Sequence, residues 1–464
     1  MLKYFTFILF VFLTGCDDNS QSSNNLNNTN NSNNSNNTSN NSNNTNNSNN
    51  TTVNNNNTTC FSNSEYVVDS LVVDIIEEGT ETHNGREMNY SMLGLKWGNM
   101  ETTYAFMVNS PLSGVAAPVI VYTMPYDIID WTGESVDEQA AAGGGAITLQ
   151  SLLDSAFIHH YNGFAFIAAF GRFYTEGSIA NDVNDMTTVL RFIADSPQFD
   201  PEAIGIHGGS WGGFESLYAA AYAPQGAVPA AGVALFPVSD FEMMVEHVTT
   251  IAQRVENPDK VEEYDHFYAP YLQRIFAAVG EDEASRNFCG FTHSDLKSRI
   301  ETPFLTYHEM HDTLVPFDQS VALVSELAPY IDPIFYKYNV PLDLETTPLS
   351  HGVFPVSVYT FMLSYLYTKL IPDAPSITIF AERPDFVSML THIREMQRSG
   401  MDISFMEKVL TDILYTTVWE GTSETLIAGD EFLAGIFNEV WCTNLTSGEV
   451  EVFLSGGIPV DTCN

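Results

Sequence analysis

The stretch "AIGIHGGSWGGFESLYAAA", residues 203–221, decides the fold. It begins as a short apolar run, turns at glycines that surround one serine and one tryptophan, and ends as an alanine-rich helical pattern. This order predicts a buried strand, a sharp turn and a helix. The turn, "GGSWG" at 208–212, fits G-x-S-x-G, in which glycine avoids a collision between strand and helix while the serine hydroxyl stands above the sheet. Ser210 is therefore a candidate nucleophile, and the alternative is a glycine-rich turn without chemistry.

Strand-like and helix-like segments alternate around this turn. Apolar runs predict strands at 117–124, 163–170, 203–208, 231–240, 302–310 and 332–340. Helical spacing predicts helices at 182–196, 215–223, 317–330 and 354–370, with Asp182 as the cap of the first. Two earlier strands, at 66–76 and 102–110, are expected to be antiparallel. Continuous apolar strands that alternate with helices indicate an α/β fold with a mostly parallel central sheet and helices on both faces.

A nucleophilic serine needs a base that is held by an acid, and in this architecture both follow the serine in the order acid, then histidine. Asp312 lies in "PFLTYHEMHDTLVPFDQS" (303–320), just past a predicted strand. His351 lies in "TTPLSHGVF" (346–354), in a loop before the last long predicted helix. Both residues are expected at the sheet edge that carries Ser210. Asp240, which ends the strand after the nucleophile helix, is the alternative acid.

Three other histidines have simpler interpretations. His308 and His311 in "HEMH" lack the four-residue spacing on a helix that an H-E-x-x-H zinc site requires, so ordinary hydrogen-bonded histidines are expected. His207 is expected to pack beneath the turn. No metal and no organic cofactor is predicted.

These residues carry a family resemblance. From about 203 to 352 the chain resembles the catalytic domain of the prolyl oligopeptidase family of serine hydrolases, which combines a GGSYGG-type turn, an H-G-x-x-D-x-x-V segment and an H-G pair. The corresponding segments here are "GGSWGG", "HEMHDTLV" and "HG". The resemblance implies an α/β-hydrolase fold, with Ser210 as nucleophile, Asp312 as orienting acid and His351 as base. With the weaker early strands it extends over roughly 65–370.

Two groups are candidates to stabilise the oxyanion. The backbone N–H of Trp211 lies near the positive end of the predicted helix. The loop "YTMPYDIIDW" (122–131) contains Pro125-Tyr126-Asp127, which is similar to a loop of the X-prolyl dipeptidyl peptidase and cocaine esterase group. That similarity implies that the Tyr126 hydroxyl is the second donor. A packed loop aromatic is the alternative.

The resemblance also suggests the division of the chain. The catalytic domain is expected over 61–372, with a helical cap insert at 241–300 whose aromatic residues are candidates to line a substrate pocket, namely Tyr264, Phe267, Tyr268 and Tyr271. The large N-terminal β-propeller common among these peptidases has no counterpart in the sequence. The segment 373–464 lies beyond the resemblance and is expected to be a small packed appendage.

The first residues of the chain predict that the protein is exported. "MLKYFTFILFVFLTGC" has one lysine, an apolar run too short to span a bilayer, and small residues before Cys16. "LTGC" resembles a bacterial lipobox, which implies a signal peptide at 1–15, a lipid on Cys16 and a position in the bacterial cell envelope. An ordinary signal peptide with a chance cysteine is the alternative. The Asn-, Ser- and Thr-rich stretch that follows cannot bury apolar surface, so 16–60 is expected to be a disordered tether.

The amino-acid composition limits the classes of partner that the protein can bind. The formal net charge is −41 with only 17 Lys and Arg, which argues against nucleic acid because its phosphates would be repelled. After Cys16, an even number of cysteines in an exported chain permits two disulfides among Cys60, Cys289, Cys442 and Cys463. The pairing stays open. Cys442 with Cys463 would hold the C-terminal tail, and free buried thiols are the alternative.

The sequence thus predicts an exported, lipid-anchored serine hydrolase that acts on a small peptide or ester substrate. The family resemblance favours a peptidase, and the missing propeller and the Pro-Tyr loop keep a carboxylic ester hydrolase as the alternative. A surface-displayed binding protein on an inactive hydrolase scaffold is a third interpretation, against which the intact order of serine, aspartate and histidine speaks.

Overall fold

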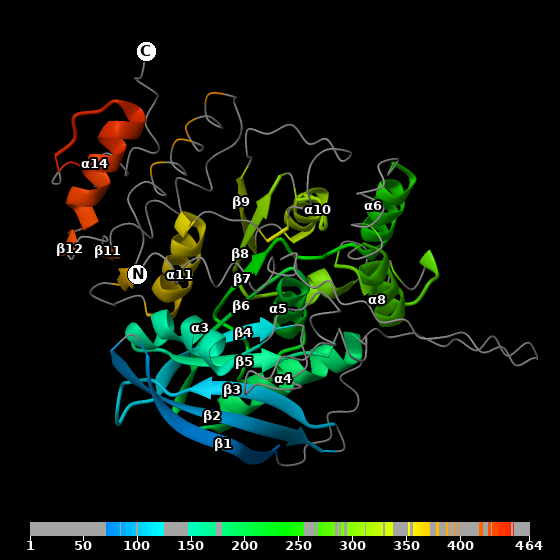
Figure 1. Ribbon diagram of the computed structural model, residues 1–464, viewed down its shortest axis with the longest axis horizontal. Coiled ribbons are helices and arrows are strands. Elements are labelled where there is room, and N and C mark those ends of the chain that lie inside the picture. The colour runs from blue at the N-terminus through cyan, green and yellow to red at the C-terminus, as the bar shows by residue number, and fades with distance from the viewer. Residues whose placement is uncertain are drawn as a thin grey trace, which may run out of the picture.

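The computed structural model describes a sheet flanked by helices (Figure 1). It describes residues 71–83, 85–98, 101–124, 147–172, 179–254, 264, 268–283, 286, 289–291, 295–310, 312–327, 330–336, 351–352, 356–371, 377–379, 387, 391, 394, 398, 417–420, 426–427, 429–446 and 449.

Among these residues, nine strands form one sheet in the order β1-β2-β3-β5-β4-β6-β7-β8-β9. Their bounds are β1 Leu71–His83, β2 Arg86–Trp97, β3 Thr103–Val108, β4 Ala117–Met124, β5 Ala165–Phe170, β6 Phe199–Gly209, β7 Ala231–Leu235, β8 Phe304–Glu309 and β9 Ile331–Tyr336. The first three strands are antiparallel to their neighbours, and β3 is antiparallel to β5. From β5 to β9 every neighbouring pair is parallel. The predicted mostly parallel sheet is confirmed.

Helices cover both faces of the sheet. Their bounds are α3 Leu149–Tyr161, α4 Ile179–Asp195, α5 Trp211–Ala221, α10 Asp318–Leu327 and α11 Val356–Leu370. Side chains of α3 and α11 belong to one buried hydrophobic cluster, with Leu152 and Leu366 as examples. Side chains of α4, α5 and α10 belong to a second cluster, with Val189, Leu217 and Leu323 as examples. The apolar side chains of the strands divide between the two clusters, which explains why these strands read as continuous apolar runs.

Three details differ from the sequence prediction. The strand β2 and the helix α3 were not predicted. In β2 polar residues interrupt the apolar run, and the buried face of α3 includes His159 and His160, so neither segment shows a clean apolar period. The helix α4 begins at Ile179, so Asp182 lies inside its first turn and the prediction that Asp182 caps this helix is wrong.

Two helices of the expected insert lie side by side, α6 (Phe241–Arg254) and α8 (Ala269–Val279) (Figure 1). They share a small cluster of buried side chains, formed by Val248, Ile251 and Tyr268. Partly buried Tyr264, Leu272 and Leu314 pack against this cluster. Leu314 comes from outside the insert, immediately after the predicted acid Asp312 and Thr313.

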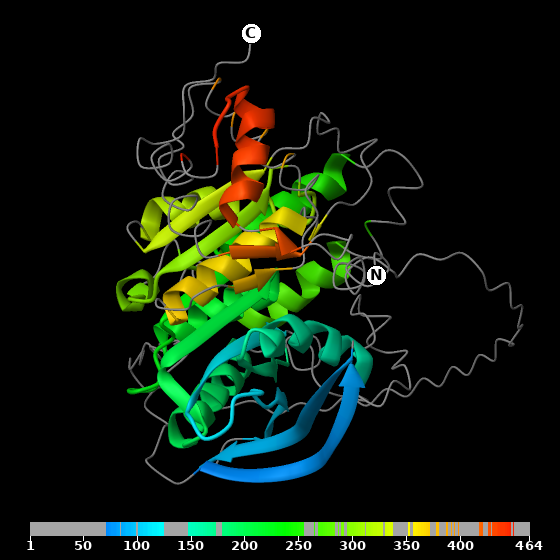
Figure 2. The same ribbon diagram turned by 90° about the vertical axis from the view of Figure 1, so that its left-hand side faces the viewer.

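The C-terminal part contributes a second sheet and a helix. The strands β10 (Ile377–Ile379), β11 (Thr417–Glu420) and β12 (Leu426–Ile427) form this three-stranded sheet among the described residues. The helix α14 (Gly429–Trp441) lies on the same side of the large sheet as α11 (Figure 2). Buried side chains of α14, Trp441 among them, join the hydrophobic cluster of α3 and α11. In the part of the chain that the structure describes, no helix combines the length and apolar character needed to cross a membrane.

Candidate active site

The turn between β6 and α5 carries Ser210. The backbone of Ser210 has φ 57° and ψ −123°, a conformation that non-glycine residues seldom adopt and that costs about 1–3 kcal/mol. Its N–H donates to the Leu235 carbonyl at 2.9 Å, and its carbonyl accepts the N–H of Phe214 at 3.2 Å, which starts the helix. The strained residue is therefore fixed from strand β7 and from helix α5.

Two positions of this turn require glycine because the end of β4 lies very close to the backbone there. A Cβ on Gly208 would lie 2.2 Å from Thr123 Oγ1, and a Cβ on Gly212 would lie 2.5 Å from the Thr123 carbonyl oxygen. The Thr123 hydroxyl itself donates to the Gly212 carbonyl at 2.6 Å. The turn therefore lies directly against the end of β4, where any side chain would force the two segments apart.

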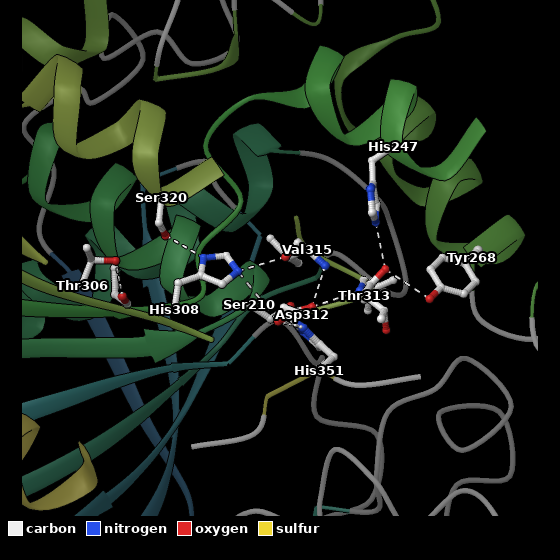
Figure 3. Close-up of polar contacts among 12 residues, drawn as sticks. Ser210, His247, Tyr268, Thr306, His308, Asp312, Thr313, Val315, Ser320 and His351 are labelled. Carbon is white, nitrogen blue, oxygen red and sulfur yellow. Dashed lines mark hydrogen bonds and ion pairs between the residues drawn. The ribbon is translucent and has the colours of Figure 1, made fainter. Parts of the chain in front are cut away.

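The structure brings Ser210, Asp312 and His351 together (Figure 3). His351 Nε2 lies 2.9 Å from Ser210 Oγ, and His351 Nδ1 lies 2.8 Å from Asp312 Oδ2. Because an ionised carboxylate only accepts hydrogen bonds, Nδ1 carries the proton and Nε2 accepts the hydrogen bond of the serine hydroxyl. The side chains of all three residues are buried. This chain of contacts links residues that are 141 positions apart.

The loop after β8 holds the Asp312 carboxylate. Its Oδ1 accepts the N–H groups of Leu314 and Val315, each at 2.9 Å. Buried His308 also holds this loop in place. Its Nε2 donates to the Val315 carbonyl at 2.9 Å, and its Nδ1 contacts Ser320 Oγ at 2.7 Å. Burial lowers the pKa of His308, which favours the neutral ring. His308 is thus a hydrogen-bonded structural histidine, as the sequence indicates.

The alternative acid, Asp240, has another role in the structure. Its Oδ1 accepts the N–H of Met243 at 2.8 Å at the start of α6. Gln319 binds both the N–H and the carbonyl of Asp240. The carboxylate that contacts His351 is that of Asp312.

Behind the turn lies a buried group of acidic residues around one arginine, which the sequence did not indicate. Arg172 binds both oxygens of Asp185, at 2.9 and 2.7 Å. Asp182 accepts the indole N–H of Trp211 at 2.9 Å and the backbone N–H of Arg172 at 2.6 Å. Glu215 is buried one turn into α5, and its carboxyl oxygens have no hydrogen-bond partner among the described residues.

Burial controls the protonation of this group. It raises the pKa of Asp182 to about 8, against the opposing effect of the two N–H donors. It raises the pKa of Glu215 well above its usual range, with repulsion from Asp182 and Asp185 adding to the effect. Acidic residues at 182 and 185 on one helix, and a glutamate in the helix after the serine, were the available sequence signal, but nothing in that spacing says that they meet.

On the opposite side of the turn, His207 is buried and stacks on Tyr122, with ring centroids 4.9 Å apart. Burial lowers the pKa of His207 to about 3, so its ring is neutral. It therefore packs beneath the turn as expected.

Several predicted site residues lie outside the described residues, namely Cys16, Tyr126, Phe267 and His311. Cys60 and Cys463 lie outside them as well, whereas Cys289 and Cys442 are each disulfide-bonded, which excludes free thiols at these two positions. Within the described part of the chain, no three His, Cys, Asp or Glu side chains are grouped so that they could hold a metal ion.

A mostly parallel sheet with a strand–serine–helix turn at its centre is the arrangement of the α/β-hydrolase fold. Residues 172–353 match the model of the prolyl oligopeptidase family, so this part of the chain is a domain of that family. Comparison with curated proteins gives no significant match.

Some solved structures resemble parts of this chain at low sequence identity. A puromycin-hydrolyzing peptidase of Mycobacterium tuberculosis is 17% identical with a TM-score of 0.42, and the match covers 63% of this chain and 43% of that one. Acetyl xylan esterase 1 from Thermoanaerobacterium sp. JW/SL YS485 is 13% identical with a TM-score of 0.40, over 64% and 88% of the two chains. Porphyromonas gingivalis dipeptidyl peptidase 4 is 13% identical with a TM-score of 0.38, over 62% and 43%. The match therefore spans less than half the length of either peptidase.

Proposed function

We propose that the protein hydrolyses peptide bonds through an acyl-enzyme, with Ser210 as nucleophile, His351 as general base and acid, and Asp312 as the orienting carboxylate. The observation that carries the proposal is the pair of hydrogen bonds from Ser210 Oγ to His351 Nε2 and from His351 Nδ1 to Asp312 Oδ2, at 2.9 and 2.8 Å. A serine hydroxyl is a weak nucleophile unless a base removes its proton as it attacks, and the base must be held in one tautomer.

The steps follow from these contacts. Ser210 Oγ forms a bond to the substrate carbonyl carbon while its proton passes to His351 Nε2. The imidazolium that results is stabilised by Asp312, which remains ionised. His351 then returns the proton to the leaving amine as the amide C–N bond breaks. A water molecule attacks the acyl-enzyme by the same route, which releases the acid and restores Ser210.

The oxyanion needs hydrogen-bond donors at the start of α5. The first N–H groups of a helix have no intrahelical acceptor, and they point toward the positive end of the helix dipole. The Trp211 N–H is the first of these, and we assign it the role of a donor to the oxyanion. We assign the second donor to the Tyr126 hydroxyl, on the similarity of its loop alone. Tyr126→Phe is expected to lower kcat about 100-fold, as the loss of one oxyanion donor does, and an unchanged kcat removes Tyr126 from the mechanism.

The preference for peptides over esters is supported by the matched family domain at 172–353. An esterase uses the same three residues, so only substrates can separate the two activities. The purified protein is to be assayed with aminoacyl-nitroanilides and with short acyl-nitrophenyl esters, alongside Ser210→Ala. We expect nitroanilide hydrolysis that disappears in the variant. Hydrolysis of the esters alone assigns the protein to the ester hydrolases instead.

A fluorophosphonate probe tests whether the protein is an enzyme at all. The probe reacts covalently with activated serines, so the wild-type protein is expected to be labelled and Ser210→Ala is not. An unlabelled wild-type protein supports the alternative of a binding protein on an inactive scaffold and rules out the proposed activity.

We further propose that the protein is exported and anchored by a lipid on Cys16. The support is the N-terminal sequence, with its short apolar run and the "LTGC" that resembles a lipobox. In a bacterial host the full chain is expected in the membrane fraction, and Cys16→Ser is expected in the soluble exported fraction. An equal distribution of the two proteins contradicts the anchor.

A further inference from the structure

The insert contacts the loop of the predicted acid at one backbone atom. The carbonyl oxygen of Thr313 accepts hydrogen bonds from His247 Nε2 at 2.8 Å and from the Tyr268 hydroxyl at 3.1 Å (Figure 3). His247 lies on α6, and Tyr268 immediately precedes α8. Because a carbonyl oxygen only accepts, His247 must carry its proton on Nε2. Both helices of the insert therefore donate to the residue that follows Asp312.

The Thr313 carbonyl belongs to the same planar peptide group as the N–H of Leu314. That N–H donates to Asp312 Oδ1 at 2.9 Å. Donors on the oxygen end of a peptide group polarise it and strengthen the hydrogen bond from its N–H end. The bonds from His247 and Tyr268 are thus coupled to the Asp312 carboxylate through one rigid unit.

Packing fixes the same peptide group. The Leu314 side chain packs against the small cluster of the insert, which includes buried Tyr268, and also against the large cluster of α4, α5 and α10. Asp312 Oδ2, the oxygen that this peptide does not bind, is the one that contacts His351 Nδ1. A movement of α6 or α8 therefore shifts the peptide that orients the carboxylate.

We infer that the insert positions the acid, with His247 and Tyr268 acting as positioning residues for Asp312 through the Thr313–Leu314 peptide. This inference rests on the proposed function. A carboxylate that is held less firmly orients and stabilises the His351 imidazolium less well. Loss of either donor should therefore lower kcat, while KM, which reports substrate contacts, should stay nearly constant.

The test compares variants that remove only the donors. Tyr268→Phe keeps the ring in its cluster and removes the hydroxyl, and His247→Phe keeps a planar ring without the N–H. His247→Gln restores an N–H donor at a similar reach. Tyr330→Phe, at an exposed tyrosine, and Glu246→Gln, at the exposed neighbour of His247, are the matched controls. The readouts are kcat and KM on the best substrate, the rate of fluorophosphonate labelling, and active-site titration to correct for unfolded protein.

We expect kcat and the labelling rate to fall about threefold to tenfold in Tyr268→Phe and in His247→Phe, the effect of losing one hydrogen bond. His247→Gln should recover most of the loss, and both controls should match the wild-type protein. An unchanged kcat with a raised KM, or equal impairment of His247→Gln and His247→Phe, overturns the inference.

The same experiment separates this inference from the proposed function. A wild-type protein that hydrolyses substrate, alongside unaffected Tyr268→Phe and His247→Phe, contradicts only the positioning by the insert. A wild-type protein without labelling or hydrolysis contradicts the proposed function, and the positioning of Asp312 for catalysis with it.

Discussion

The indole N–H of Trp211 donates a hydrogen bond of 2.9 Å to the buried carboxyl group of Asp182. Trp211 follows the predicted nucleophile directly, and its ring is fully buried among the aromatic side chains of Phe214 and Phe241. Asp182 also accepts the backbone N–H of Arg172 at 2.6 Å. The first residue of α5 is thus tied to α4 and to the segment after β5, which makes Asp182 the natural place to perturb the turn.

Asp182→Asn should reduce the free energy of unfolding less than Asp185→Asn does. Because burial raises the pKa of Asp182 to about 8, its carboxyl is mostly protonated at pH 7, so Asp182→Asn removes little charge. The two carboxyl oxygens each accept one N–H group, and the asparagine Nδ2 cannot accept, so the variant should lose about 1–2 kcal/mol of unfolding free energy. Asp185→Asn removes the charge that pairs with buried Arg172 and should cost about 3 kcal/mol. Urea denaturation at pH 7 measures both. Equal losses would mean that Asp182 is ionised in the folded protein.

Asp182 also predicts a dependence of stability on pH. Between its ordinary pKa of 3.8 and the raised value of about 8, the folded protein holds a proton that the unfolded chain has released. The contribution of Asp182 to the unfolding free energy is therefore full below pH 3.8, falls as pH rises through this window and levels off above pH 8. Asp182→Asn should remove this fall. The difference between wild-type and variant stability, measured from pH 6.5 to 9, tests the sign.

His207 predicts the opposite behaviour in acid. Its folded pKa of about 3 lies below the ordinary value of 6.5, so below pH 6.5 the unfolded chain binds a proton that the folded protein does not. The stabilising contribution is complete above pH 6.5 and declines as pH falls toward 3, by up to about 1.4 kcal/mol per pH unit. His207→Phe, which keeps a ring against Tyr122, should lose less stability between pH 7 and pH 5 than the wild-type protein. Parallel curves for the two proteins would refute the buried neutral histidine.

Gly212→Ala should be more damaging than Gly114→Ala. The new Cβ of Gly212→Ala would lie 2.5 Å from the Thr123 carbonyl oxygen, so backbone must shift at the turn itself. Gly114 has a φ of 77°, but a methyl group added there would meet no atom within 4 Å, so Gly114→Ala costs only the conformational strain, about 1 kcal/mol. Thermal denaturation measures the stability of each variant, and the rate of fluorophosphonate labelling reports whether the turn still presents a reactive Ser210. Labelling of Gly212→Ala at the wild-type rate would show that the turn accommodates a side chain.

Asp312→Asn should leave the fold intact and remove most of the activity. An asparagine can still accept a backbone N–H at Oδ1, but its amide does not stabilise an imidazolium and favours the wrong tautomer of His351. We expect kcat to fall about 10⁴-fold, with little change in KM. Asp240→Asn, at the alternative acid, is the comparison, and a larger loss of kcat there would reverse the assignment of the acid.

Much of the fold was predictable because its signals are local. The apolar run 117–124 matches β4 residue for residue, since a strand buried on both faces is apolar along most of its length. The segment β2 and the helix α3 were missed because their buried faces include polar side chains, and burial of a polar side chain depends on partners elsewhere in the chain. His159 illustrates this, since it meets Tyr367, 208 positions away.

The candidate site was likewise predictable only in part from the sequence. The motif and the order of residues pointed to Ser210, Asp312 and His351, and the structure brings them within hydrogen-bond distance, while their roles in catalysis stay predictions. The link between Asp182 and Trp211, and the donors on Thr313, had no sequence signal. Each joins side chains that are not neighbours in any periodic pattern.

The sequence by itself determined the strand–turn–helix around Ser210, the alternation that makes a parallel sheet, and the order in which the acid and the histidine follow. These depend on the spacing of residues along the chain, which backbone geometry translates directly into position. Only the tertiary structure decided which carboxylate meets His351, which buried acids hold protons, and how the insert reaches the loop of Asp312. Those outcomes depend on distances and burial between segments far apart in the chain, because protonation and hydrogen bonding respond to the surroundings that folding creates.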